Sequence, residues 1–218
     1  SITPLGVAGF NVIQALSSQS ADDPRKASRP FDKDRDGFLM GEGAGILVLE
    51  SRSHAEKRGA RIHAVVSGSS MSCDANHLTA PHPEGRGAIE AMDKAVKAAG
   101  IEPEEVDYIN AHGTSTQIND PTETKAIKAV FGSHASKLRV SSTKSMTGHC
   151  IGAAGGIEAI VLVLALRDQY FPATINLDNP DTDCDLDYVA NKGASGEINV
   201  AMSNTFGFGG HNGVVVMR

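Results

Sequence analysis

The stretch Ser141–Gly156 reads SSTKSMTGHCIGAAGG and leads from a short apolar segment into a run of small residues. It places Lys144 and His149 five positions apart, directly ahead of glycines and alanines. Small residues let another backbone or a ligand come close, and the start of the following helix adds positive dipole character. The plain structural alternative is a solvated lysine and a packed histidine at a helix entrance.

An earlier segment repeats this arrangement. The segment 106–112, VDYINAH, is typical of a strand and ends in His112, and the hydroxyls of Thr114, Ser115 and Thr116 follow at once. In open α/β sheets, functional groups gather beyond the carboxyl ends of strands. A polar turn whose hydroxyls cap backbone groups would give the same pattern. Two such strand ends in one chain favour a functional site.

Strand-like and helix-like segments alternate along the chain. Strands are expected for the apolar or β-branched runs 44–50, 62–72, 106–112 and 138–143 and for the late pair 197–204 and 211–218. Helices are expected near the N-terminus, with Val7, Phe10, Ile13 and Leu16 on one face, and over 51–59, 87–100, 120–132 and 151–168. The pattern predicts an α/β architecture with a mixed sheet flanked by helices.

Three details of this pattern can be compared with a structure. Asp120 is expected to cap the helix 120–132. The helix 151–168 is nearly all apolar, which predicts burial on most of its sides. A polar loop, residues 17–37, is expected between the first helix and the first strand.

Composition excludes several classes of protein. The 218 residues are 40% hydrophobic, and the net charge of −6 argues against nucleic-acid binding. The longest apolar run, Ala159–Leu166, has eight residues, whereas about 20 are needed to cross a bilayer. Three widely spaced cysteines without a CxxC pair do not indicate a disulfide framework or a zinc site. We expect a soluble, cytosol-type protein.

The turn 205–210, TFGFGG, places Phe206 and Phe208 among three glycines. Glycine permits the positive φ of a hairpin turn, which is the plain explanation. Two exposed rings on a flexible turn are nevertheless unfavourable, so we expect them to cover an apolar pocket as a loop that opens and closes.

Weaker signals are discounted. GEGAG, residues 41–45, lacks the full dinucleotide-binding spacing and precedes an expected strand where that motif must follow one. Cys73, His77 and His82 are too irregularly spaced to favour a metal site. Cys150 follows His149 directly, but a small buried thiol is the simpler interpretation.

Three motifs in this order, NAHGTST, SSTKSMTGHCIGAAGG and SNTFGFGGHN, resemble those of the elongating β-ketoacyl-acyl-carrier-protein synthases, which are thiolase-like condensing enzymes. RPFDKDRDGFLMGEGAG and FPATINLDNPD are similar to the family as well, so the resemblance covers essentially the whole chain. The family fold has two similar α/β halves. The resemblance implies that 1–218 is the C-terminal part: about 1–50 completes the end of the first half, and about 51–218 forms the second.

The resemblance also implies the chemistry, a decarboxylative Claisen condensation of an acyl thioester with malonyl-acyl carrier protein in fatty-acid elongation. The family's nucleophilic cysteine belongs to the first half, and no segment here matches its motif. Cys150 lies where the family usually has an apolar residue, so we expect the isolated chain to be inactive.

The resemblance assigns roles to residues of this chain. Catalytic roles fall to His112, Lys144 and His149, with Glu158 as the acidic partner of Lys144. Thr114 and Thr116 match residues that hold the phosphopantetheine arm, and Phe206 and Phe208 match the gating loop over the acyl pocket. No metal and no cofactor of the chain's own are implied, because phosphopantetheine arrives on the carrier protein.

The implied partners are acyl carrier protein, acyl and malonyl thioesters, and a second copy in a homodimer, without nucleic acid or membrane. The implied location is the cytoplasm, or an organelle lumen with bacterial-type fatty-acid synthesis. Two alternatives stay open: a noncatalytic chain-length-determining partner subunit, and a ketosynthase domain of a polyketide synthase. Retention of His112, Lys144 and His149 favours an enzyme.

Overall fold

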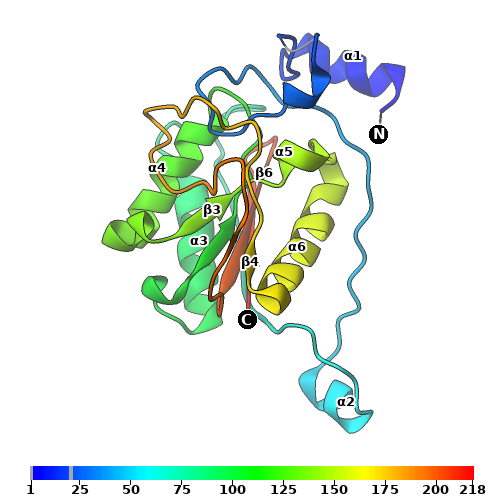
Figure 1. Cartoon of the computed structure of the whole chain (residues 1–218), viewed down its shortest axis with the longest axis vertical. Coiled ribbons are helices and arrows are strands. Elements are labelled where there is room, and N and C mark those ends of the chain that lie inside the picture. The colour runs from blue at the N-terminus through cyan, green and yellow to red at the C-terminus, as the bar shows by residue number, and fades with distance from the viewer. Residues whose placement is uncertain (1, 20–21) are drawn as a thin grey trace.

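The computed structural model describes residues 2–19 and 22–218; Ser1 and part of the expected polar loop, residues 20–21, lie outside the described residues. Within these residues a mixed five-stranded sheet forms the centre, in the order β1–β7–β6–β2–β3 (Figure 1). Its strands are β1 Val66–Cys73, β2 Tyr108–Asn110, β3 Arg139–Ser141, β6 Ala201–Gly207 and β7 His211–Met217. The pairs β1–β7 and β7–β6 are antiparallel, whereas β6–β2 and β2–β3 are parallel.

Helices cover both faces of the sheet (Figure 1). α3 (Arg86–Ala99) and α4 (Asn119–Phe131) lie on one face, and α6 (Ala154–Asp168) lies on the other. The other helices are α1 Pro4–Val12, α2 Arg52–Lys57 and α5 Lys144–Thr147, with 3₁₀ turns at Pro24–Lys26, Pro103–Glu105, Gly132–Ser136 and Ile151–Ala153. β4 (Tyr170–Phe171) and β5 (Ala194–Ser195) form a small separate sheet. The predicted α/β architecture with a mixed sheet flanked by helices is confirmed.

Neighbouring residues of the parallel strands contribute to different cores. Ile109 and Met202 join the core under α3 and α4, whereas Tyr108 and Ala201 join the core under α6. This alternation follows from the two-residue period of a strand. Both faces are covered, so all three residues of β2 are buried, as is typical of parallel strands.

The two strand ends that the sequence singles out lie side by side. β2 and β3 are parallel neighbours, and their register pairs Asn110 with Ser141. The polar loops that follow, 111–118 and 142–150, therefore leave the same edge of the sheet from adjacent strands. Both sets of candidate residues meet there.

The run 44–50 is not the buried strand that its apolar sequence predicts. It has no regular secondary structure, and Ile46, Val48 and Leu49 are 87%, 86% and 74% exposed. Figure 1 shows this segment running past α6 toward α2. A strand is stabilised by hydrogen bonds to a neighbouring strand, and no strand of the described residues pairs with 44–50. The prediction was wrong because apolar composition does not supply a neighbour.

Glycines place the start of this segment against the helix entrance. A Cβ on Gly45 would lie 2.5 Å from the backbone of Gly156, and one on Gly41 would lie 2.2 Å from the carbonyl oxygen of Thr147. Side chains at these positions would collide with backbone. Of the small residues at 152–156, Gly156 admits a second backbone, that of Gly45, as expected for this run.

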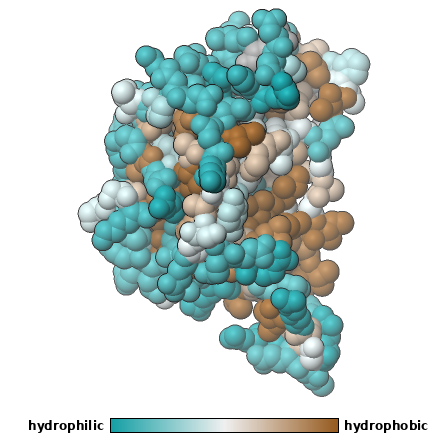
Figure 2. Space-filling view, viewed as in Figure 1, coloured by the Kyte–Doolittle hydropathy of each residue, from teal (hydrophilic) through white to brown (hydrophobic). Residues whose placement is uncertain are grey.

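α6 is buried along one face only, so the expectation of burial on most sides is wrong for the structure described. Its buried residues, Ala154, Glu158, Leu162 and Ala165, face the sheet, while Leu164 is 39% exposed. Figure 2 shows hydrophobic residues gathered on the side where Figure 1 places α6 and the extended segment. No helix of residues 2–19 and 22–218 has the length and hydropathy needed to span a bilayer.

Two helix boundaries differ from expectation. α4 begins at Asn119, so Asp120 is inside the helix and not its N-cap. Its buried carboxylate instead accepts a hydrogen bond from the backbone N–H of Phe31 at 2.9 Å, a partner that local sequence does not reveal. α1 ends at Val12 and does not reach Leu16, because Gln14 adopts a left-handed φ of 54°.

Candidate active site

His112 lies directly beyond β2, and a carboxylate fixes its backbone. Glu123 of α4 accepts hydrogen bonds from the backbone N–H of His112 at 2.9 Å and of Gly113 at 2.8 Å. Asn204 of β6 donates to the same carboxylate at 3.1 Å. Burial raises the pKa of Glu123 to about 7, although these hydrogen bonds favour its charged form. The His112 side chain is buried, and its Nδ1 has no hydrogen-bond partner among the described residues.

His149 follows α5, and hydrogen bonds fix both its backbone and its ring. Its backbone N–H donates to the carbonyl of Leu39 at 2.7 Å, and its carbonyl accepts from Gly41 at 3.0 Å. The ring Nδ1 accepts a hydrogen bond from the N–H of Ile151 at 3.2 Å. In the neutral imidazole the proton is therefore on Nε2, which leaves Nε2 as a donor.

The two imidazoles lie edge to face, with ring centroids 5.4 Å apart and an interplanar angle of 84°. Lys144 and Glu158 form an ion pair near them, and their side chains are only 2% and 3% exposed. Burial first, and the Lys144 charge second, lower the pKa of His149 to about 3. The same causes, with a contribution from His149, hold the pKa of His112 well below its usual range. Both rings are neutral near pH 7.

Each charge of the ion pair offsets the cost of burying the other. Burial raises the pKa of Glu158, and the neighbouring ammonium group of Lys144 opposes that rise. A buried ammonium group without a partner is strongly unfavourable. The structure thus brings Lys144 and its expected partner together across the fourteen positions that separate them in the sequence.

The hydroxyl-rich loop lies next to His112. Thr114 is buried, Thr116 is half-buried, and their Oγ1 atoms are 2.9 Å apart in a hydrogen bond. Ser115 between them has a left-handed φ of 68°. This backbone kink brings the two threonine hydroxyls together.

Aromatic rings surround the histidine pair. The ring centroid of Phe206 lies 5.7 Å from that of His112, and the ring centroid of Phe38 lies 5.2 Å from that of His149. Phe10 links Phe38, at 5.3 Å, with Phe208, at 6.2 Å. Phe208 is 47% exposed on the turn. Sequence reasoning missed Phe38 and Phe10 as site residues, although the motif RPFDKDRDGFLMGEGAG that carried the resemblance contains Phe38.

The discounted residues have ordinary structural roles. His77 Nδ1 accepts a hydrogen bond from the N–H of Thr79 at 3.2 Å, and His82 Nδ1 accepts one from the N–H of Glu84 at 3.0 Å. Within the part of the chain that the structure describes, no group of three or more His, Cys, Asp or Glu residues is arranged to hold a metal ion. Cys150 is buried, and burial raises the pKa of its thiol, so it is a poor thiolate nucleophile.

Two family models match the chain. The model of the β-ketoacyl synthase C-terminal domain matches residues 63–178, which are 116 of the 218 residues, and the model of the N-terminal domain matches residues 1–55. The chain belongs to the β-ketoacyl synthase family. The histidine pair and the Lys144–Glu158 ion pair lie within the residues that the C-terminal domain model matches.

Curated relatives are similar over nearly all of this chain. It is 58% identical over 211 residues to 3-oxoacyl-[acyl-carrier-protein] synthase 2 of Synechocystis sp., covering 97% of this chain and 50% of that protein. It is 54% identical over 217 residues to the synthase 2 of Staphylococcus aureus, covering 100% of this chain and 53% of that protein. The chain spans about half the length of the curated relatives it matches.

Solved structures show the same fold. A ketosynthase bound to a hexaketide, in complex with its type II polyketide acyl-carrier protein, is 44% identical with a TM-score of 0.97, covering 100% of this chain and 53% of the other. A β-ketoacyl synthase from Burkholderia phymatum is 36% identical with a TM-score of 0.94, covering 100% and 52%. The fold is the thiolase-like fold of ketosynthases, as expected.

Proposed function

We propose that this chain is the C-terminal part of a β-ketoacyl-acyl-carrier-protein synthase of fatty-acid elongation. In this proposal about 1–50 completes the N-terminal half, and about 51–218 forms the C-terminal half. The observation that carries the proposal is the pair of neutral imidazoles 5.4 Å apart beside a buried lysine. Such a pair is suited to donate hydrogen bonds to one oxygen on which negative charge develops.

The reaction has two halves. An acyl group first moves from its carrier thioester to a cysteine of the N-terminal half, and the carrier thiol leaves. Malonyl-carrier thioester then loses carbon dioxide, and the resulting enolate carbon attacks the acyl-cysteine carbonyl, releasing the cysteine thiolate. His112 and His149 stabilise the enolate oxygen as donors. Lys144 keeps them neutral, because its charge disfavours an imidazolium nearby.

The remaining residues handle the substrate. Thr114 and Thr116 bind the phosphopantetheine arm, which the carrier protein brings, so the chain needs no cofactor of its own. Phe206 and Phe208 gate the acyl pocket. The partners are acyl carrier protein and a second synthase subunit, and the synthase works in the cytoplasm or in an organelle lumen with bacterial-type fatty-acid synthesis. The solved ketosynthase complex with its carrier protein supports the first of these partners.

A polyketide ketosynthase or a noncatalytic chain-length subunit is the second candidate. Similarity to a type II polyketide ketosynthase, and to a ketosynthase solved with a chain length factor, favours it. The higher identity to a curated 3-oxoacyl-[acyl-carrier-protein] synthase 2, 58% against 44% for the polyketide ketosynthase, favours elongation. Presence of both histidines and the lysine favours a catalytic subunit.

The test uses the intact synthase that contains this chain. It is incubated with labelled acyl-carrier protein and then with malonyl-carrier protein, and product and covalent adducts are followed by mass spectrometry. We expect acylation of one cysteine outside these 218 residues and turnover to a 3-oxoacyl product. Absence of any acyl-enzyme would support the noncatalytic subunit instead.

The isolated 218-residue chain provides the control. It contains Cys73, Cys150 and Cys184. We expect none of them to be acylated, because the two buried thiols have raised pKa values and Cys73 does not lie in a motif that matches that of the family's nucleophile. Reproducible acylation of Cys150 with turnover would place the nucleophile within this chain and overturn the division of labour proposed here.

A further inference from the structure

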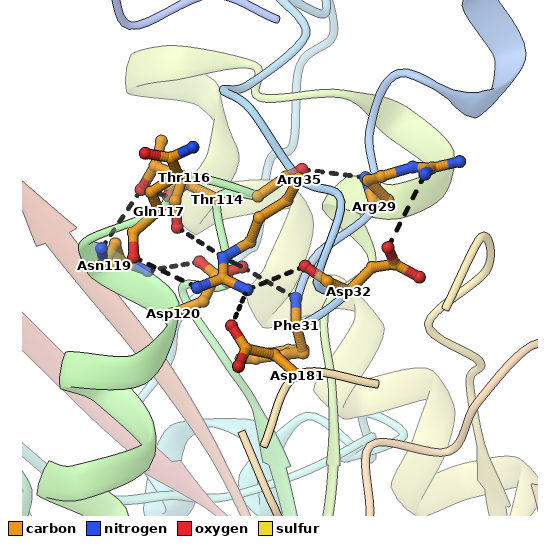
Figure 3. Close-up of polar contacts among 12 residues, drawn as sticks. Arg29, Phe31, Asp32, Arg35, Thr114, Thr116, Gln117, Asn119, Asp120 and Asp181 are labelled. Carbon is orange, nitrogen blue, oxygen red and sulfur yellow. Dashed lines mark hydrogen bonds and ion pairs between the residues drawn. The ribbon is translucent and has the colours of Figure 1, made fainter. Parts of the chain in front are cut away.

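A single buried guanidinium group joins segments that are far apart in the sequence (Figure 3). The Arg35 side chain is only 4% exposed. Its Nε donates to the carbonyl of Thr116 at 2.9 Å, and its Nη2 donates to the carbonyl of Gln117 at 3.2 Å. Its Nη1 donates to the carbonyl of Asp32 at 2.8 Å and to the carboxylate of Asp181 at 2.6 Å.

Two carboxylates balance the charge of Arg35. Asp181 is hydrogen-bonded to it, and the buried Asp120 carboxylate lies 3.7 Å from Nε. Burial alone would lower the pKa of Arg35, but these carboxylates more than offset it and leave the pKa raised. Asp120 also accepts the N–H of Phe31 at 2.9 Å, so the segment around Arg35 is itself held in place.

The contacts of this segment converge on the loop that carries the threonine hydroxyls. Gly37 donates its N–H to the carbonyl of Ser115 at 3.0 Å, and Arg29 donates its N–H to Ser115 Oγ at 3.0 Å. Arg35 binds the carbonyls of Thr116 and Gln117. Three consecutive residues of the loop, 115–117, are therefore hydrogen-bonded to segment 29–37. Ser115 holds a φ of 68°, a sparsely populated conformation that persists only when its surroundings impose it.

We propose that Arg35 is a positioning residue for the phosphopantetheine-binding loop, acting through the carbonyls of Thr116 and Gln117 to fix the hydroxyls of Thr114 and Thr116. The inference rests on the proposed function, because it needs those hydroxyls to bind the arm of the substrate. Arg35 lies among the residues matched by the N-terminal family model, whereas the loop lies among those matched by the C-terminal model. The guanidinium thus sets the geometry of a site across the boundary between the two matched regions.

Arginine is required here for its shape as well as its charge. A planar fork donates to several carbonyls and a carboxylate at once, whereas a lysine ammonium is a point charge on a flexible stem. An Arg35→Lys variant keeps the charge that Asp120 and Asp181 need but cannot span the carbonyls of both Thr116 and Gln117. It therefore separates the loss of positioning from the loss of charge balance.

The experiment measures KM and kcat of the intact synthase for two malonyl donors, malonyl-pantetheine and a malonyl ethyl thioester that lacks the pantetheine arm. The variants are Arg35→Lys and Arg35→Met. For Arg35→Met we expect KM for malonyl-pantetheine to rise about 10- to 100-fold, because a displacement of the order of 1 Å is enough for such a loss. Arg35→Lys should show a smaller rise, and KM for the ethyl thioester should stay near the wild-type value in both.

The matched control is Lys33→Gln, which removes a positive charge from the same segment at an exposed position. It should leave both KM values unchanged. Asp181→Asn is the second route if Arg35→Met does not fold, and it should raise KM for malonyl-pantetheine in the same direction with a smaller effect.

Equal effects on both donors, or a lowered melting temperature with unchanged KM, would show Arg35 to be structural only and overturn the inference. A wild-type synthase that condenses while all Arg35 variants keep normal KM values overturns the inference but not the proposed function. A wild-type synthase that condenses with neither donor nor with malonyl-carrier protein overturns the proposed function and the inference with it.

Discussion

The rings of His112 and His149 lie edge to face, yet the chain holds them in different ways. Glu123 fixes the backbone of His112, and the ring Nδ1 has no partner among the described residues. The ring of His149 is itself fixed, because Ile151 donates its N–H to Nδ1. Backbone geometry therefore sets the tautomer of His149, whereas no neighbouring residue described in the structure sets that of His112.

What the two histidines share is their electrostatic environment. Burial and the Lys144 charge lower the pKa of both. The difference between them is thus one of orientation and not of charge. A change at Lys144 should affect both rings, whereas a change at Glu123 should affect the position of His112 alone.

The largest effect is expected from removing Lys144, whose charge lowers the pKa of both histidines. Lys144→Ala should destabilise the intact synthase by about 3–5 kcal/mol, because Glu158 remains as a buried charge without its partner. It should also abolish condensation and let the pKa of both histidines rise. Denaturant unfolding gives the free energy, and a carrier-protein assay gives the activity.

The double variant Lys144→Met with Glu158→Gln is the control for that prediction. It removes both buried charges, so part of the lost stability should return while activity stays lost. A Lys144→Ala variant that unfolds like the wild type would mean that the lysine is solvated in the intact protein and that the shared environment is wrongly described.

The next effect concerns the rings themselves. His112→Ala and His149→Ala should each lower malonyl decarboxylation about 10²- to 10³-fold, the usual loss for one donor to a developing oxyanion. Transfer of the acyl group to the cysteine should suffer less, because the enolate forms only in the second half-reaction. Carbon dioxide release and acyl-enzyme formation are measured separately.

His63→Ala, at an exposed position, is the matched control and should leave both half-reactions intact. If both site variants slow acyl transfer as much as decarboxylation, the histidines do not act specifically on the enolate. A decarboxylation defect in only one of the two variants would mean that the two histidines differ in role as well as in orientation.

A smaller effect is expected in the pH dependence of stability. The folded pKa of His149 is about 3, below the unfolded value of about 6.5. The unfolded chain therefore binds the extra proton, and this contribution to stability, present above pH 6.5, is lost as the pH falls toward 3. The loss amounts to about 2 kcal/mol between pH 7 and 5.

Comparison of wild type with His149→Asn isolates that contribution. Glu123, with a raised folded pKa of about 7, acts in the opposite direction, because its contribution is lost as pH rises, but it is present in both proteins and cancels. The free energy of unfolding of the wild type should fall by about 2 kcal/mol relative to that of His149→Asn on going from pH 7 to pH 5. A constant difference would mean that His149 titrates normally.

Local pattern predicts those parts of this molecule that local structure determines. The pattern of a strand that ends in a hydroxyl-rich turn predicted β2, β3 and their two loops, because adjacent residues determine the change from strand to turn. The approach of Gly156, within the run of small residues 152–156, to another backbone was predictable for the same reason. Pairing of Lys144 with Glu158 came from family resemblance and not from spacing.

Long-range contacts were not predictable from local pattern. Arg35 and Thr116 are 81 positions apart, and the local sequence around either residue does not indicate a contact with the other. Phe10 has the spacing of an ordinary helix face, and its place between Phe38 and Phe208 depends on the whole fold. The run 44–50 was mistaken for a strand because strand formation depends on a neighbour that its own residues do not specify.

The smallest effect on stability is expected at the turn over the site, where two phenylalanines differ as the two histidines do. Phe206 packs against the core and the His112 ring, whereas Phe208 is 47% exposed and meets Phe10. Phe208→Ala should cost about 1 kcal/mol or less, since only part of its surface is buried, yet alter the rate of cysteine acylation. Phe206→Ala should cost more stability, because Phe206 packs against the core. Normal acylation by Phe208→Ala, with a large loss of stability, would make Phe208 an ordinary packing residue and not a gate.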